Sequence, residues 1–100
     1  MRVTEHAKGR MKERMGLPKK SLDKVAQKAI ERGITHAQAT GQLKKYMDGV
    51  FLSHNNASEM RIYNQKMFVF TSDFTLITVF KVPTNLLPAV NKISKRMKGF

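Results

Sequence analysis

The sequence predicts an α+β fold in which N-terminal helices pack on a small antiparallel β-meander and a basic helix ends the chain. Apolar residues recur with the 3.6-residue period of a helix in the first half, and from Glu59 they alternate with the two-residue period of a strand. After Pro83 the helical period returns. Because the chain has 100 residues, we expect a single domain with one core.

The first helix is predicted to begin after Thr4, whose hydroxyl can cap it. One arc of this helix combines an imidazole, two guanidiniums and a carboxylate, from His6, Arg10, Arg14 and Glu13. Histidine can donate and accept a proton near neutral pH, and arginine is a fixed cation suited to phosphate. This row is our candidate site, although the same pattern is typical of an ordinary solvated helix surface.

Two further features of this helix favour an anion site. Gly9 lies in its middle, where glycine costs about 1 kcal/mol relative to alanine, so we interpret it as a point of close approach to the backbone. Arg10 and Arg14 lie one turn apart and repel each other unless an anion or Glu13 lies between them.

A second helix is predicted from Ser21, which can cap it, to Gly33, which can end it. Its apolar residues follow the spacing i, i+3, i+4, i+7, i+8: Leu22, Val25, Ala26, Ala29 and Ile30. The lysines at its start and on its outer face are expected to be solvated: Lys19, Lys20, Lys24 and Lys28.

A third helix is predicted from Thr35 to about Gly49, although Gly41 weakens its first part and favours a later start. The second and third helices could form a DNA-binding helix-turn-helix. Gly41 and the scarcity of Asn, Gln and Arg on the third helix argue against that interpretation.

The meander is predicted as strands 60–63, 66–71 and 74–82, with turns at Asn64-Gln65 and Ser72-Asp73. Met60, Ile62, Met67, Val69 and Leu76 then share one face, and Arg61, Tyr63, Phe68 and Phe70 share the other. If helices cover only the first face, the second can hold stacked bases beside a phosphate-binding arginine. The alternative is that helices cover this aromatic face, which is more typical of aromatic residues in strands.

A short basic helix is predicted from about Leu86, because Pro83 ends the last strand and Pro88 fits only in the first turn of a helix. Its apolar stripe is expected to dock on the rest of the protein. Its outer cations are candidate nucleic-acid contacts: Lys92, Lys95 and Arg96.

The net charge of +12 at pH 7 is the strongest global signal. Residues 1–33 hold ten Lys or Arg against four acidic residues, and residues 83–100 hold four against none. RNA, DNA or an acidic protein surface are the natural partners of such a chain. The alternative is that the charge serves only solubility.

The composition also excludes several kinds of site. The absence of cysteine rules out disulfides and thiolate metal sites, and suits the cytoplasm. No apolar run approaches the ~20 residues that span a bilayer, and no signal peptide is recognisable, so we expect a cytoplasmic protein without a membrane partner. Without a Gly-rich phosphate loop, a carboxylate cluster or a nucleophile motif, we expect neither metal nor cofactor.

The opening box His6-Ala7-x-x-Arg10-Met11-x-x-Arg14, with the meander from Arg61 to Val79, resembles a group of small bacterial and phage proteins similar to the BrnT and RelE-like toxins. The resemblance covers residues 3–82. It implies a RelE-like domain that sequesters or cuts RNA, with basic and aromatic sheet residues holding the substrate. The chain departs from this pattern in its long second and third helical region, its terminal helix and its lack of a paired acid and base.

RNA cleavage without a metal needs a base, an acid and cations around the phosphate. His6 is the candidate acid or base, with Glu13 or Tyr63 as its partner. The candidate nucleic-acid contacts come from the first helix, the meander and the last helix: Arg10, Arg14, Arg61, Phe68, Lys92, Lys95 and Arg96.

Two functions follow. The first is an RNA-binding protein of RelE-like type, with or without ribonuclease activity, acting on RNA or on a nucleoprotein complex such as the ribosome or a host defence complex. The second is a non-catalytic phage-type inhibitor or accessory factor that docks on a host nucleic-acid-handling complex. Both assume that the charged row of the first helix converges with Arg61 and Tyr63 in one cationic pocket.

Overall fold

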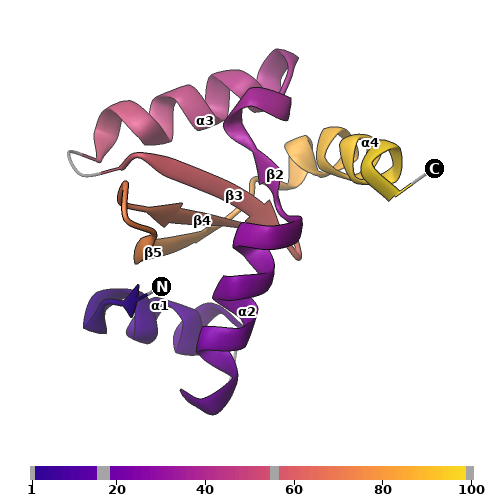
Figure 1. The fold of residues 1–100 in the computed structure, drawn as a ribbon. Helices are drawn as coiled ribbons and strands as arrows, with labels where there is room; N and C mark the ends of the chain where they lie inside the picture. Colours follow the sequence, from indigo (N-terminus) through magenta and orange to yellow (C-terminus); the bar gives the residue numbers. More distant parts are fainter. Residues whose placement is uncertain (1, 16–18, 55–56, 99–100) are drawn as a thin grey trace.

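A five-stranded sheet forms the middle of the molecule, in the order β1-β5-β4-β3-β2, with helices on both sides (Figure 1). This computed structural model describes residues 2–15, 19–54 and 57–98. The strands are β1 (Arg2–Val3), β2 (Ile34–Thr35), β3 (Glu59–Tyr63), β4 (Lys66–Phe70) and β5 (Thr75–Lys81). The helices are α1 (Glu5–Met15), α2 (Lys19–Arg32), α3 (Gly41–Ser53) and α4 (Leu87–Lys98), with 3₁₀ turns at His36–Gln38 and Thr84–Leu86.

The α+β class, the antiparallel meander and the C-terminal helix are confirmed. The sheet is larger than predicted, because β2 pairs antiparallel with β3 and β1 pairs parallel with β5. Each of these two edge strands has two residues, too few to produce a recognisable alternation in the sequence.

The core consists of two apolar clusters, one on each face of the sheet. Under α1 and α2 lie Ala7, Leu22, Ala26, Ala29, Phe68, Phe70, Leu76 and Val79. On the α3 and α4 side lie, among others, Leu43, Met47, Met60, Ile62, Met67, Val69, Val90 and Ile93. The meander therefore has no open face.

Of the two interpretations that the sequence left open, the one in which helices cover the aromatic face is confirmed. The interpretation of this face as an open platform for bases is therefore wrong, and helices cover the other face as well. Phe68 and Phe70 are both 0% exposed. Phe68 therefore cannot stack on a base, which corrects its predicted role in nucleic-acid binding. The physical reason is that a buried aromatic ring removes about 150–250 Å² from water, which α1 and α2 make possible here.

Leu76 lies with Phe68 and Phe70, not with Met67 and Val69 as predicted. Val69 pairs with Thr78 but the next residue, Phe70, pairs with Leu76, so β5 has one extra residue at this point. Such a β-bulge shifts the side chains beyond it to the opposite face. Strict two-residue alternation cannot reveal it.

The start of α1 is built as the sequence predicts. The Thr4 hydroxyl accepts a hydrogen bond from the Ala7 amide at 3.1 Å, and the Thr4 amide donates to the Leu76 carbonyl at 3.0 Å. The cap thus also ties the helix to β5. A β-carbon placed on Gly9 would meet no described protein atom within 4 Å, so the close approach inferred from Gly9 is not made by the described part of the protein.

Gly33 allows α2 to pack closely against β3. A β-carbon at this position would lie 2.5 Å from the Ala29 carbonyl oxygen and 2.9 Å from the Arg61 β-carbon. The helix itself begins at Lys19, two residues before the predicted cap, and ends at Arg32. The sequence therefore locates the end of α2 correctly, but the reason for the glycine is a tertiary contact.

The remaining boundaries follow local signals. Thr35 caps the 3₁₀ turn rather than the long helix, and α3 begins later, at Gly41, whose φ of +58° favours glycine. The turn at Asn64 and Gln65 has φ values of 50° and 62°, typical of a tight hairpin turn of type I′. Across the described residues, every helix is too short or too polar to traverse a lipid bilayer.

Candidate nucleic-acid interface

The structure describes two of the four side chains in the charged row predicted on α1. His6 and Glu13 are exposed on this helix. Arg10 and Arg14 belong to α1, but their side chains lie outside the described residues. The proposed pairing of His6 with two guanidiniums therefore stays a prediction.

Arg61 is held between α2 and the sheet, and its side chain is only 11% exposed. Its Nε donates to the Ile30 carbonyl at 3.4 Å, and its Nη1 donates to the Met60 carbonyl at 2.9 Å. The guanidinium also lies 5.6 Å from the centroid of the Phe74 ring and 3.8 Å from the Glu59 carboxylate. These contacts give Arg61 a structural role in holding α2 on β3.

The single cationic pocket expected from the sequence stays a prediction, because it includes the side chains of Arg10 and Arg14. Within the described residues, His6 makes no hydrogen bond or ion pair with Arg61 or Tyr63. The two groups also face different surroundings, because His6 is exposed whereas Arg61 is nearly buried. Of the predicted site residues that the structure describes, Tyr63 lines a cleft.

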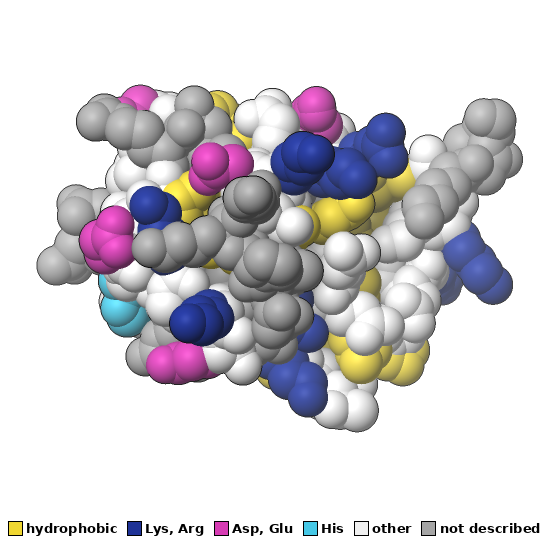
Figure 2. Space-filling view, turned by 90° about the horizontal axis from the view of Figure 1, so that it is seen from below, with side chains coloured by type: hydrophobic (Ala, Val, Ile, Leu, Met, Phe, Trp, Pro, Cys, Tyr) yellow, Lys and Arg dark blue, Asp and Glu magenta, His cyan; other side chains and the backbone are white. Residues whose placement is uncertain are grey.

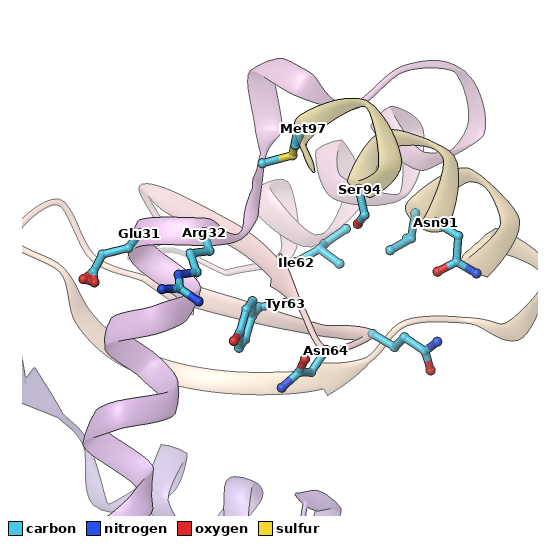
Figure 3. A pocket seen from close by; sticks show the side chains of 10 residues that line it. Glu31, Arg32, Ile62, Tyr63, Asn64, Asn91, Ser94 and Met97 are labelled. Carbon is cyan, nitrogen blue, oxygen red and sulfur yellow. The ribbon is translucent and has the colours of Figure 1, made fainter. Parts of the chain in front are cut away.

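Tyr63 lines a cleft of about 600 Å³ between the C-terminal end of α2 and helix α4, at the edge of the sheet (Figure 3). The walls come from four segments: Glu31 and Arg32 of α2, Ile62 and Tyr63 of β3, Asn64 and Gln65 of the hairpin turn, and Val90, Asn91, Ser94 and Met97 of α4. In Figure 3, Arg32 and Tyr63 lie on one side of the cleft and Ser94 and Asn91 lie across from them.

The cleft combines apolar and polar groups. Ile62 is 2% exposed and Tyr63 is half-buried, whereas Arg32, Asn64 and Asn91 are exposed. Most of the lining residues are polar, and Tyr63 contributes the aromatic ring. The sequence indicated only Tyr63 as a site residue, because the other walls come from segments about 30 residues away in both directions along the chain.

A row of cations lies along α2 and ends at this cleft with Arg32. Lys24, Lys28 and Arg32 are exposed at one-turn intervals, so the row extends about 12 Å along the helix axis. None of the three forms an ion pair with another described residue. Asp23 and Glu31 lie on the adjoining side of α2 and reduce the positive potential there. We call these three residues the α2 basic row.

The predicted contacts of the last helix, Lys92, Lys95 and Arg96, are exposed on α4. Lys92 and Arg96 lie one turn apart on the arc opposite the residues that line the cleft, and Lys95 adjoins Asn91. Figure 2, which views the α1 and α2 side of the molecule, shows Lys and Arg side chains at several places, with Asp and Glu side chains between them. The positive surface is thus spread over several elements.

Comparison of the chain with protein-family models, with curated proteins and with solved structures finds no significant match. The resemblance to the BrnT and RelE-like toxins stays a prediction. Within the described residues, no three His, Cys, Asp or Glu side chains gather in a way that could hold a metal ion.

Proposed function

We propose that this protein binds nucleic acid, with RNA as the first candidate, and that the α2 basic row is the centre of the interface. The observation that carries the proposal is the row itself, three exposed cations at one-turn spacing without an ion-pair partner among the described residues. Like charges at this spacing destabilise a helix by a few tenths of a kcal/mol per pair. Phosphates along the row would remove that repulsion.

The overall charge supports the same function. A net charge of +12 attracts polyanions over distances comparable to the Debye length, about 10 Å at 0.1 M salt. The cations on α4 extend the positive surface beyond the cleft. Phosphate contacts of this kind determine affinity but carry no sequence information.

The proposed activity is binding of nucleic acid and not its cleavage. His6, the candidate acid or base, is exposed on α1, and no histidine is among the described residues that line the cleft. Recovery of intact RNA after long incubation with the protein is consistent with this proposal. Cleavage that disappears in His6→Ala would instead support the ribonuclease hypothesis.

Removing two charges from the α2 basic row is expected to weaken RNA binding and its salt dependence. Each phosphate contact contributes about 0.7 to the slope of log K against log salt for a single strand. The double variant Lys24→Gln/Lys28→Gln should therefore lower that slope by roughly 1.4. Fluorescence anisotropy with a labelled RNA at several salt concentrations measures it.

The control is Lys44→Gln/Lys45→Gln on α3, which removes the same charge from exposed positions across the sheet. Lys44 lies 3.9 Å from the Asp48 carboxylate, an exposed pair of the kind that contributes little to stability. We expect its slope to stay close to that of the original protein. Equal losses in the two double variants would mean that binding depends on total charge and not on the row. Failure of the unmodified protein to bind RNA would refute the proposed function.

A second candidate function, docking on a host nucleic-acid-handling complex, is favoured by an apolar spot on α3. Leu52 is 81% exposed and Phe51 is 41% exposed, which is unusual for large apolar side chains next to each other. A partner that survives nuclease treatment in affinity purification, and is lost with Phe51→Gln/Leu52→Gln, would support docking. Loss of all partners after nuclease treatment would contradict it.

A further inference from the structure

We infer that the cleft beside Tyr63 receives an unpaired base, so that the protein prefers single-stranded over double-stranded nucleic acid. This inference rests on the proposed function, because it requires that the α2 basic row bring the nucleic-acid backbone to the cleft. Arg32 joins the two features, since it is the last member of the row and also lines the cleft. A strand that follows the row is thereby led to the cleft.

The dimensions of the cleft and the aromatic ring of Tyr63 fit a planar, partly apolar group. Its volume of about 600 Å³ lies within the range of small-molecule sites, roughly 300–1,000 Å³. Tyr63 supplies a half-buried aromatic ring whose inner part packs on the cluster beneath α2, whereas its neighbour Ile62 belongs to the cluster on the α4 side of the sheet and is only 2% exposed. That packing holds the ring in place before a ligand arrives, which reduces the entropy lost on stacking.

The polar groups around the cleft match the edges of a base. The amides of Asn64 and Asn91 each offer two N–H donors and a carbonyl acceptor, and the Ser94 hydroxyl can donate and accept. Asn64 lies in the type I′ turn, so its backbone is held by the hairpin. Unpaired bases are read by such groups on their exposed edges.

The charges at the cleft orient the nucleotide. Arg32 and Glu31 come from the same turn of α2, but Arg32 lies closer to Tyr63, whereas Glu31 points away from it (Figure 3). A phosphate is thus favoured next to Arg32 and disfavoured on the far side, where the carboxylate would repel it. The base then extends from Arg32 toward Tyr63 and α4.

A duplex cannot fill this cleft without unpairing a base, and unpairing has a free-energy cost. The test compares a single-stranded RNA that contains 2-aminopurine with a duplex of the same length. The expected result is tighter binding of the single strand and quenching of 2-aminopurine fluorescence by stacking. Tyr63→Leu, which keeps an apolar side chain, should weaken single-strand binding by roughly tenfold or more and leave duplex binding unchanged.

Two controls keep the test decisive. Tyr46→Leu removes the other tyrosine of the chain, which lies on α3, and should change neither affinity. Asn91→Ala/Ser94→Ala changes only residues of α4 and should also weaken single-strand binding. This double variant tests the base site even if the Tyr63→Leu protein does not fold.

The two proposals fail in different ways. Equal affinity for single strand and duplex, no quenching, or cleft variants that bind like the original protein would each overturn the base site and leave the backbone interface standing. Absence of binding to both RNAs would overturn the proposed function itself.

Discussion

Replacing Phe68 with alanine is expected to lower the free energy of unfolding by about 3–5 kcal/mol. The ring is 0% exposed and packs in the cluster beneath α1 and α2, so its loss removes apolar contacts and leaves a cavity. Because a domain of this size is typically stable by about 5–15 kcal/mol, the variant should unfold at much lower urea concentration. Circular dichroism during urea titration measures the change.

The control for Phe68 is Leu52→Ala on α3, where the side chain is 81% exposed. We expect its unfolding free energy to change by no more than about 0.5 kcal/mol. A Phe68→Ala protein that kept its stability and lost RNA affinity would contradict the buried position. It would restore the interpretation of the sheet as an open platform for bases.

Replacing Gly33 with alanine is expected to cost about 2–3 kcal/mol of unfolding free energy. The added methyl carbon would lie 2.9 Å from the Arg61 β-carbon and 3.1 Å from the Ile62 carbonyl oxygen, both on β3. A β-carbon and a carbonyl oxygen are fixed by the backbone of β3 and cannot rotate away, so the end of α2 must shift relative to β3. Urea titration again measures the cost.

Gly9→Ala provides the matched control, because its new methyl group would meet no described protein atom within 4 Å. Alanine is the better helix former in the interior of α1, so this variant should gain about 0.5–1 kcal/mol. If Gly33→Ala were equally harmless, the close packing of α2 on β3 would be wrong. The wall of the cleft formed by Arg32 would then be misplaced as well.

The local elements were predictable because local physics determines them. The Thr4 cap, the helical spacing of the second helix and the turn at Asn64-Gln65 each depend on a few neighbouring residues. The short edge strands were not predictable. Two-residue strands such as β1 form only because the neighbouring strand offers free backbone groups.

The candidate site shows the same division. Lys92, Lys95 and Arg96 are exposed as predicted, because a short amphipathic helix turns its charged residues outward. The stacking role of Phe68 was wrong, because its exposure depends on where α2 lies, and strand alternation contains no information on that. The position of Arg61 between α2 and the sheet depends on the same packing. The side chains of Arg10 and Arg14 lie outside the described residues. The charged site expected on α1 therefore stays a prediction.

By itself, the sequence determined the α+β class, the order of the main helices and strands, and the excess of positive charge at both ends of the chain. Only the tertiary structure decided that both faces of the sheet are covered and that α2, β3 and α4 enclose a cleft beside Tyr63. The reason is that period and capping act within one element. Burial and cleft formation depend on contacts between segments that are distant in the chain.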